Sequence, residues 1–354
     1  MYYSLKCHRC RHVYGSGYKS QVCGGCGGIL EVVYRGRLKA SGFDAADFWS
    51  YEPVLPKAKY RYFDVGGTKL VKDRRHNGLY LKMETSNPTH SFKDRGSIVE
   101  IAKAAEYGYR EVVCASTGNM AYSVSYYAKL YGMKAKIFVS DNASPDKIRD
   151  IRGVGDASVT KVNGDFNEAQ KHAIRYSERS GAFLAGDYCY RKEGQKTIAY
   201  EIMKAMPSVG AMIVPVGNAT LLSGVFKALD EMKSFRLIRK KPLIVGVEAK
   251  GCNPLEEAVK RGRSVSYIRP RTAADAIAVG YPTFGMQALE YMKRDKGIVI
   301  SVTDKEMEFE QKELYESLGI IAELAAVAGI AAYGKLRTKI GKGTAVSILS
   351  GANV

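Results

Sequence analysis

The chain alternates short apolar, β-branched runs with longer segments in which apolar residues recur every three or four positions. The short runs have the pattern of buried strands, and the longer segments have that of helices with one apolar face. The predicted strands are 79–82, 112–115, 136–139, 158–162, 212–216, 243–247, 298–301 and 345–349. The predicted helices are 92–107, 119–132, 165–179, 193–205, 219–233, 305–317 and 323–337.

This order of strand and helix predicts an α/β fold in which mostly parallel sheets are covered by helices. The 354 residues are enough for two domains, or for one large α/β unit with an appendage. The region 250–285 contains three prolines and is the least regular part of the chain. We therefore expect a loop there that faces the substrate.

The composition is ordinary for a soluble globular protein, with 46% hydrophobic and 25% charged residues. The longest apolar stretch, 318–333, is interrupted by Glu323 and is too short to span a membrane. The first residues lack a basic segment followed by an apolar core, so we expect no signal peptide. These features predict a cytoplasmic protein without a membrane partner.

The net charge of +18 raises the question of nucleic-acid binding. Lysine and arginine are spread along the whole chain, without a basic block or interleaved aromatic residues. We therefore expect no nucleic-acid partner. A generally basic surface can instead steer anionic small molecules toward a cleft.

Four of the seven cysteines form two Cys-x2-Cys pairs, separated by a loop rich in polar residues and glycine. They are Cys7, Cys10, Cys23 and Cys26. This spacing predicts a structural zinc ribbon, because four thiolates fill a tetrahedral site and leave no open position. Two disulfides are the alternative, which a cytoplasmic location disfavours. The isolated cysteines, which we expect to be buried thiols, are Cys114, Cys189 and Cys252.

Lys93 stands directly after a turn that contains Pro88 and opens the predicted helix 92–107. The dipole of a helix disfavours a cation in its first turn, which suggests that Lys93 serves as an amine. The alternative is a cluster of Lys93, Asp94 and Arg95 on a solvated face.

Three further segments follow predicted strands, at the ends where open α/β sheets bind ligands. Residues 116–119 read Ser-Thr-Gly-Asn, which suits a carboxylate or serves simply as a helix N-cap. Residues 215–221 open a helix and form a cup of N–H groups for a phosphate. Ser350 follows the last strand, where its hydroxyl can meet a ring nitrogen or end a turn. Together with the Lys93 amine, these groups indicate pyridoxal phosphate.

With these motifs the chain resembles the fold-type-II pyridoxal-phosphate enzymes, also called tryptophan synthase β-like enzymes. Within that group it resembles the threonine synthase family in particular. The segments that carry the resemblance are 26–34, 87–96, 116–119, 193–197 and 215–218. It implies two three-layer α/β/α domains around mostly parallel sheets, plus an N-terminal zinc-ribbon module. It places the module at residues 1–36 and the catalytic body at 37–354. A smaller domain, at about 95–190, is expected to be inserted in the larger one.

The resemblance also implies a role for each motif residue. Lys93 is expected to form a Schiff base with the cofactor, Asn119 to bind its ring hydroxyl oxygen, and Ser350 to face its pyridine nitrogen. The residues expected at the cofactor phosphate are Gly217, Asn218, Ala219, Thr220 and Leu221. The residues expected at the substrate are Ser116, Thr117, Gly118 and Arg191, with Arg191 at its phosphate.

The implied activity is that of a lyase that converts O-phospho-L-homoserine and water to L-threonine and phosphate. The implied partner is therefore a small phosphorylated amino acid, and the implied assembly is a homodimer.

Several residues depart from the family pattern near the expected substrate phosphate. Met120 stands where a hydroxyl residue is usual, and Ala185 and Gly186 stand where asparagine and serine are usual. His90 replaces a glycine, either as a packed ring or as a new acid–base group. Three other functions stay open: β-replacement on O-phosphoserine, as in a cysteate or cysteine synthase, a serine or threonine dehydratase, and a non-catalytic regulatory or zinc-ribbon interaction protein.

Overall fold

The computed structural model describes residues 2–36, 47–141, 143, 145–155, 157–164, 166–341 and 343–352. The chain divides into two compact units, each built from several stretches of sequence. The first unit consists of residues 1–38, 49–65 and 93–194. The second unit consists of residues 39–48, 66–92 and 195–354.

The first unit begins with a small antiparallel sheet in the order β2-β1-β3. Its strands are β1 (Tyr2–Cys7), β2 (Val13–Gly15) and β3 (Leu30–Arg35). We call residues 2–35 the ribbon. Leu5, Leu30 and Val32 form its apolar inside and are almost fully buried. The ribbon carries all four cysteines of the predicted zinc site.

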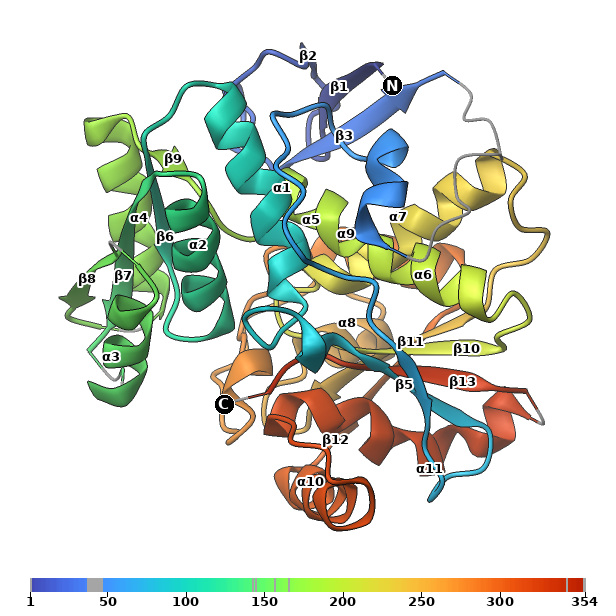
Figure 1. Ribbon diagram of the computed structural model, residues 1–354. Helices are drawn as coiled ribbons and strands as arrows, with labels where there is room; N and C mark the ends of the chain where they lie inside the picture. The colour runs from blue at the N-terminus through green and yellow to red at the C-terminus, as the bar shows by residue number, and fades with distance from the viewer. Residues whose placement is uncertain are drawn as a thin grey trace. The chain divides into compact units, whose positions relative to one another are not determined.

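A parallel sheet in the order β8-β7-β6-β9 forms the rest of the first unit. Its strands are β6 (Glu111–Ala115), β7 (Lys134–Ser140), β8 (Ala157–Val162) and β9 (Phe183–Leu184). The helices are α1 (Lys93–Glu106), α2 (Asn119–Leu130), α3 (Pro145–Gly153), α4 (Phe166–Ser180) and α5 (Cys189–Gln195). Figure 1 shows α2 and α4 on opposite sides of β6 and β7, which both helices contact.

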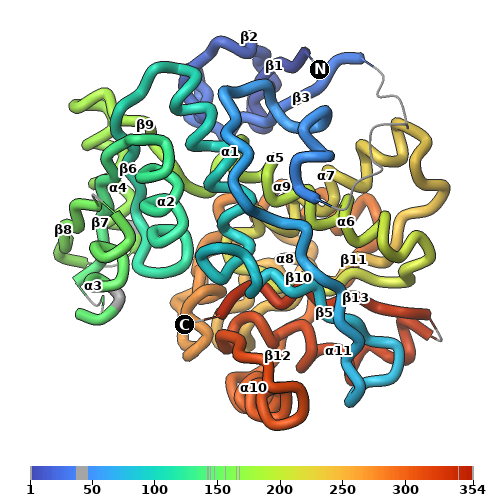
Figure 2. Tube along the Cα trace, viewed as in Figure 1, coloured from blue at the N-terminus to red at the C-terminus, as the bar shows by residue number. Residues whose placement is uncertain are grey.

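The second unit contains a six-stranded sheet in the order β12-β11-β10-β13-β5-β4. All neighbouring strands are parallel except β4, which pairs with β5 in an antiparallel hairpin. The strands are β4 (Leu70–Lys72), β5 (Leu79–Met83), β10 (Ala211–Pro215), β11 (Leu243–Ala249), β12 (Ile298–Val302) and β13 (Ala345–Leu349). Figure 2 shows β5 and β13 side by side, although they come from distant parts of the sequence.

Helices cover both faces of this sheet (Figure 1). On one face lie α6 (Thr197–Ala205), α7 (Thr220–Ser234) and α9 (Gly285–Arg294), and on the other lie α10 (Asp304–Leu318) and α11 (Ala328–Ile340). The eight-residue helix α8 (Pro254–Arg261) packs against α9 and β12. None of the described helices is both long and apolar enough to cross a membrane.

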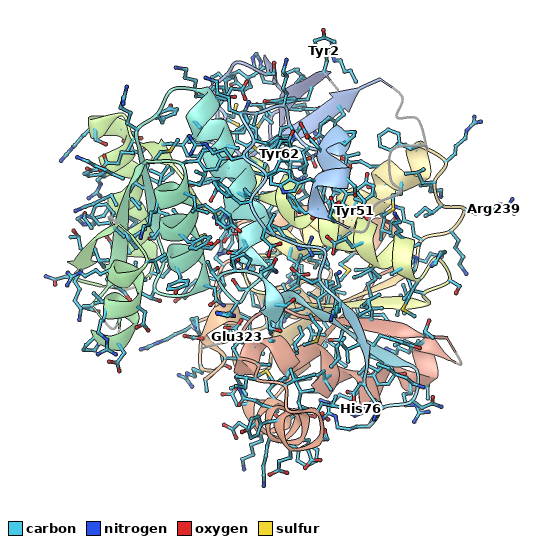
Figure 3. All side chains as sticks on the ribbon, viewed as in Figure 1. Tyr2, Tyr51, Tyr62, His76, Arg239 and Glu323 are labelled. Atoms are coloured by element: carbon cyan, nitrogen blue, oxygen red, sulfur yellow. The ribbon has the colours of Figure 1, made fainter. Side chains whose placement is uncertain are left out.

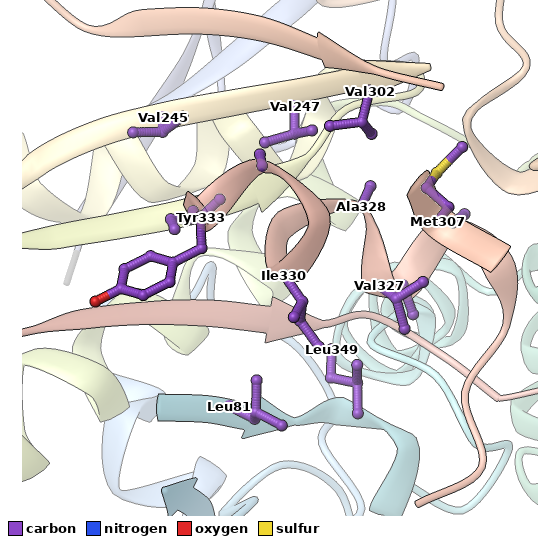
Figure 4. Close-up of a cluster of buried hydrophobic side chains, with 14 of the residues drawn as sticks. Leu81, Val245, Val247, Val302, Met307, Val327, Ala328, Ile330, Tyr333 and Leu349 are labelled. Carbon is purple, nitrogen blue, oxygen red and sulfur yellow. The ribbon is translucent and has the colours of Figure 1, made fainter. Parts of the chain in front are cut away.

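The apolar core of the second unit lies between the sheet and α11 (Figure 4). In Figure 4, Ile330 of α11 points toward Leu349 of β13. Tyr333, Leu81 and Val247 belong to the same cluster, and all five side chains are at most 3% exposed. Burial of each such side chain stabilises the fold by about 1.5–3 kcal/mol. The carboxyl ends of the parallel strands are thereby held in register, where loops can present polar groups.

A polar cluster closes the β4–β5 hairpin at its tip, where Figure 3 labels His76. Asp73 accepts a bond from Arg75 at 2.8 Å and lies 3.0 Å from His76, while Arg75 also pairs with Glu310 of α10 at 2.9 Å. Burial raises the pKa of Asp73, but the bonds from His76 and Arg75 outweigh it and bring the pKa to about 2. The cluster ties the hairpin to α10.

The predicted α/β class, with mostly parallel sheets covered by helices and an N-terminal module bearing the four cysteines, is confirmed. All eight predicted strands are present, with ends that differ by at most two residues. The boundaries predicted for the module and for the inserted domain stay predictions.

Two predicted helices are wrong in detail. Helix 193–205 is two helices, because α5 ends at Gln195 and α6 begins at Thr197. Helix 323–337 starts as the 3-10 helix η5 (Leu324–Val327), and only then continues as α11. The sequence pattern also missed α3, α8, α9 and the short strands β4 and β9, whose periodic runs are too short or too polar to stand out.

Candidate functional site

Lys93 is the first residue of α1, as the sequence predicts. The segment before it belongs to the second unit and is anchored to the end of β13. The N–H of Phe92 donates to the carbonyl of Ser350 at 2.9 Å, and the N–H of Ala352 donates to that of His90 at 2.9 Å. The Ser350 backbone therefore neighbours the residue that precedes Lys93 in the chain.

His90 lies in this anchored segment with a φ of 57°, a left-handed conformation that favours glycine. The residue is exposed, and its Nδ1 lies 3.4 Å from the carbonyl oxygen of Thr85. Because His90 is exposed, its ring is not packed inside the protein, which was one of the two alternatives for this residue. The left-handed backbone explains why a glycine is suited to this position.

The side chain of Lys93 faces a carboxylate that the sequence pattern did not single out. Its Nζ lies 3.9 Å from Oδ1 of Asp187, and the two side chains are 19% and 6% exposed. Asp187 stands in the loop between β9 and α5. The amine of Lys93 is therefore partly buried beside a negative charge within the first unit.

Arg191 is fully buried, and its guanidinium connects α5 to α1. It forms a buried ion pair with Glu100, and its Nη2 donates to the hydroxyl of Ser97 at 3.1 Å. Its Nε donates to the carbonyl of Gly186 at 3.0 Å, and its Nη1 to the carbonyl of Lys93 at 3.3 Å. Four acceptors within the fold thus engage the side chain that was predicted to bind the substrate phosphate.

Glu100, the partner of Arg191, is also fully buried. Burial raises its pKa to about 7, and the nearby charge of Arg191 and the N–H of Gly186 oppose this rise. The N–H of Gly186 donates to Oε2 of Glu100 at 3.2 Å. Glu100 and Arg191 together fix the loop that carries Asp187.

Two glycines allow α1 and α5 to pack backbone against backbone. A Cβ at Gly194 would lie 1.7 Å from the carbonyl oxygen of Arg95, and a Cβ at Gly96 would lie 2.5 Å from Cγ of Arg191. Such distances are far below van der Waals contact. The glycines of the two motif segments 87–96 and 193–197 are therefore needed for this close approach.

The Ser-Thr-Gly-Asn segment lies between β6 and α2, as predicted. The N-cap of α2 is Gly118, and no side chain caps it among the described residues. Ser116 instead accepts a bond from the N–H of Gly118 at 3.3 Å. The simple N-cap alternative for this segment is therefore not what the structure shows, and the first turn of α2 remains suited to an anion.

The predicted phosphate cup lies in the second unit, between β10 and α7. The N-cap of α7 is Ala219, in a left-handed conformation with φ 59° and without a side-chain cap. A Cβ at Gly217 would lie 2.9 Å from the carbonyl oxygen of Ala276, so the close packing of this loop requires glycine. The Oδ1 of Asn218 accepts bonds from Thr283 at 3.1 and 3.3 Å.

The residues present fit pyridoxal phosphate. The 15-residue helix α7 begins with an uncapped turn, which suits a phosphate group. Ser350 is 3% exposed, and its hydroxyl makes none of the hydrogen bonds seen among the described residues. A buried hydroxyl of this kind can bond to a ring nitrogen. The partly buried Lys93 amine supplies the group that an aldehyde needs.

The four cysteines of the ribbon lie together, with all Sγ atoms within 4.8 Å of one another. The Sγ atoms of Cys7 and Cys26 are 3.5 Å apart, and those of Cys10 and Cys23 are 3.6 Å apart. These are not disulfide distances, and they approach the ~3.8 Å expected for thiolates around tetrahedral zinc. A hydrogen bond from Tyr14 lowers the pKa of Cys23 to about 6, which favours its thiolate.

The isolated cysteines Cys114, Cys189 and Cys252 are buried and form no disulfide, as the sequence predicts. Burial raises the pKa of Cys114 to about 12 and that of Cys252 to about 11. Both therefore stay as neutral thiols and act as small apolar side chains.

The ribbon also contacts the segment that holds Asp187 and Arg191. Tyr34 donates to Glu193 at 2.7 Å, Lys192 pairs with Glu31 at 2.8 Å, and Gln21 donates to the carbonyl of Leu184 at 2.9 Å. Helix α5 therefore contacts the ribbon on the one hand and, through Arg191, the backbone of Lys93 on the other.

The sequence pattern singles out neither Glu100 nor Asp187. Glu100 carried a weak signal, because it is a charged residue between the apolar positions of a buried helix. Asp187 carried none, because it stands in a loop without periodicity. Its proximity to Lys93 arises only from the folding of the chain.

These features define an α/β protein with a lysine at a helix start and uncapped helix N-termini at strand ends, the class that binds pyridoxal phosphate through a lysine. The model of the family described as pyridoxal-phosphate dependent enzyme matches residues 62–351. The chain belongs to this family and is a pyridoxal-phosphate-dependent lyase.

The chain is similar to proteins of two related activities. A threonine synthase from Methanosarcina acetivorans is 31% identical, over 94% of this chain and 87% of the relative. An L-threonine ammonia-lyase from Thermotoga maritima is 34% identical, over 78% of this chain and 67% of the relative. Threonine deaminase isoform 2 from Solanum lycopersicum has a similar structure, with a TM-score of 0.70, 27% identity and coverage of 81% and 79%. The resemblance to threonine synthases is thus confirmed.

The close packing of α1 on α5 makes a prediction about stability. We expect Gly194→Ala to lower the free energy of unfolding by about 3 kcal/mol or more, because the new Cβ meets rigid backbone. Gly334→Ala is the matched control, since Gly334 is exposed in α11 and a Cβ added there would meet no atom within 4 Å. It should stabilise by about 0.5–1 kcal/mol. Urea unfolding measures the free energy of unfolding of both variants. If Gly194→Ala were as stable as the wild type, the close packing of α1 on α5 would be contradicted.

Proposed function

We propose that the protein is a threonine synthase, which converts O-phospho-L-homoserine and water to L-threonine and phosphate. The observation that carries this proposal is the placement of Lys93 at the start of α1, within a chain similar over 94% of its length to a threonine synthase. We further propose a cytoplasmic homodimer, as the family resemblance implies.

We propose a role for each motif residue toward the cofactor. Lys93 would bind its aldehyde carbon, and Asn119 would bind its ring hydroxyl oxygen. The backbone of residues 217–221 would bind its phosphate, and Ser350 would face its pyridine nitrogen. When bound, pyridoxal phosphate supplies an electron sink for bonds broken at the substrate α-carbon. The neutral Ser350 hydroxyl need not keep the ring nitrogen protonated, which suits elimination and replacement chemistry.

The chain's own groups then bind the substrate and move its protons. Ser116, Thr117 and Gly118, at the start of α2, bind the α-carboxylate through hydroxyl and N–H groups. The amine of Lys93 takes a proton from Cα and then one from Cβ as the phosphate leaves Cγ. Protons return to Cγ and Cα, and water adds its hydroxyl at Cβ while its remaining proton goes to the released phosphate. Arg191 acts through Lys93, because its guanidinium holds the Lys93 carbonyl.

Removal of the lysine tests the cofactor assignment. We expect Lys93→Ala to lose the visible absorbance that pyridoxal phosphate gives when a lysine binds it, and to lose activity by at least about a hundredfold. Lys134→Ala, an exposed lysine at the start of β7, is the control and should keep both. Retention of the absorbance in Lys93→Ala refutes the proposed role of Lys93.

A second candidate, a serine or threonine ammonia-lyase, is favoured by the segment 185–187. Ala185 and Gly186 carry no side chain able to bind a phosphate, and Asp187 repels one. Arg191 could attract a phosphate, but its guanidinium already donates to four acceptors within the fold. The similarity to the L-threonine ammonia-lyase fits this alternative, but it extends over less of the chain.

A panel of substrates separates these functions. We expect phosphate and threonine from O-phosphohomoserine, and no phosphate from O-phosphoserine with or without sulfide or sulfite. A 2-oxo acid from unphosphorylated serine or threonine, without phosphate release from O-phosphohomoserine, would replace the proposal by the ammonia-lyase. Lack of turnover of every substrate in protein that binds the cofactor would favour the non-catalytic alternative.

We also propose that the ribbon binds one structural zinc ion through Cys7, Cys10, Cys23 and Cys26. The mutual Sγ distances support it. The four thiolates fill a tetrahedral site, so the metal has a structural role rather than a catalytic one.

We expect about one equivalent of zinc in the purified protein, and its loss in Cys23→Ser. Cys252→Ser, which removes a buried thiol of the second unit, is the control and should keep the metal. Elemental analysis measures both, and less than about 0.2 equivalents in the wild type would refute the zinc site. Light scattering on the same preparation tests the homodimer.

A further inference from the structure

Asp187 is a nearly buried carboxylate that no motif of the family resemblance assigns. Its Oδ1 lies 3.9 Å from Nζ of Lys93, and its side chain is 6% exposed. Carboxylates are rarely buried to this degree unless they pair with a cation. Asp187 therefore places a buried negative charge beside Lys93, the residue that we propose binds the cofactor.

The position of Asp187 is fixed by groups from two helices. Gly186, the residue before it, donates its N–H to Glu100 of α1 and accepts a bond from Nε of Arg191 of α5. The same guanidinium donates to the carbonyl of Lys93. One buried side chain thus holds the backbone of Lys93 and that of Gly186, the residue before Asp187.

The titratable groups that interact with Asp187 include Glu100, Cys114 and Tyr188, and Arg191 lies beside Glu100. Burial raises the pKa of both Cys114 and Tyr188 to about 12, so both are neutral at pH 7. Glu100 and Arg191 bind each other. The carboxylate of Asp187 places a negative charge 3.9 Å from the amine of Lys93.

We propose that Asp187 is a positioning residue that holds the proton on the nitrogen of Lys93. The proposal rests on the proposed function, in which that nitrogen binds the cofactor and later exchanges protons with the substrate. An opposite charge within about 4–6 Å favours the charged form of its partner. The carboxylate therefore keeps the nitrogen protonated while the cofactor is bound. It also stabilises the ammonium that forms when Lys93 takes the proton from Cα.

The role depends on the charge of Asp187 and not on its shape. An asparagine has the same size and can still accept a hydrogen bond, but it offers no negative charge to the nitrogen. A glutamate keeps the charge at a somewhat different place. The pair Asp187→Asn and Asp187→Glu therefore separates an electrostatic role from a purely structural one.

The experiment follows the visible absorbance of the bound cofactor against pH, in the purified holoenzyme and its variants. We expect Asp187→Asn to shift the midpoint of this titration to lower pH by about one unit, because the protonated nitrogen loses its counter-charge. At pH 7 we expect kcat to fall about tenfold with KM changed less than about twofold. Asp187→Glu should keep most of the wild-type midpoint.

Asp150→Asn is the matched control, since Asp150 is an exposed carboxylate of α3 in the same unit, and it should leave midpoint and kcat unchanged. An unchanged midpoint in Asp187→Asn overturns the proposal. So does a folded Asp187→Asn that no longer binds the cofactor, because the proposed role alters titration and not binding. Should Asp187→Asn fail to fold, Asp187→Ser provides the same loss of charge and is judged by the same midpoint.

Failure of this proposal is distinguishable from failure of the proposed function. Absorbance retained in Lys93→Ala removes the basis of both. Absorbance lost in Lys93→Ala, together with an unchanged midpoint in Asp187→Asn, leaves the cofactor site intact and removes only the role of Asp187.

Discussion

The buried pair of Glu100 and Arg191 is the interaction on which the lysine site of the first unit depends. It joins α1, which begins at Lys93, to α5, and it fixes Gly186 at the base of the intervening loop. Removal of one partner of such a pair leaves an uncompensated buried charge, which costs about 3–5 kcal/mol. The pair is possible only because Gly96 and Gly194 let the two helices approach. Backbone packing, a buried ion pair and the position of Lys93 are therefore one connected arrangement.

The ribbon extends this arrangement toward the N-terminus. Lys103 of α1 is buried among the rings of Tyr3, Tyr107 and Tyr190, with its Nζ 4.4–5.4 Å from the ring centroids. Burial lowers the pKa of Lys103, and its bond to Glu106 opposes that change. Tyr3 belongs to the ribbon, and Tyr190 to α5. A module expected to need a metal for its own stability is thus packed against the helix that carries Arg191.

The substrate question depends on the same loop. A threonine synthase must attract a phosphate, whereas the described residues 185–187 provide a methyl group, a glycine and a carboxylate. The overall similarity to threonine synthases supports the proposed reaction, while this local chemistry favours an uncharged hydroxy amino acid. A fold and a cofactor site do not by themselves decide the substrate.

The sequence alone determined the α/β class, all eight strands it predicted, the helix start at Lys93 and the strand-end loops, because these features depend on local periodicity and short motifs. It also predicted the cysteine cluster, whose members are brought together by two short turns. Only the tertiary structure placed Asp187 beside Lys93, enclosed Arg191 and exposed His90. These outcomes depend on contacts between residues far apart in the chain, such as Lys93 with Asp187 and Glu100 with Arg191, and no local pattern records which loop will meet which helix.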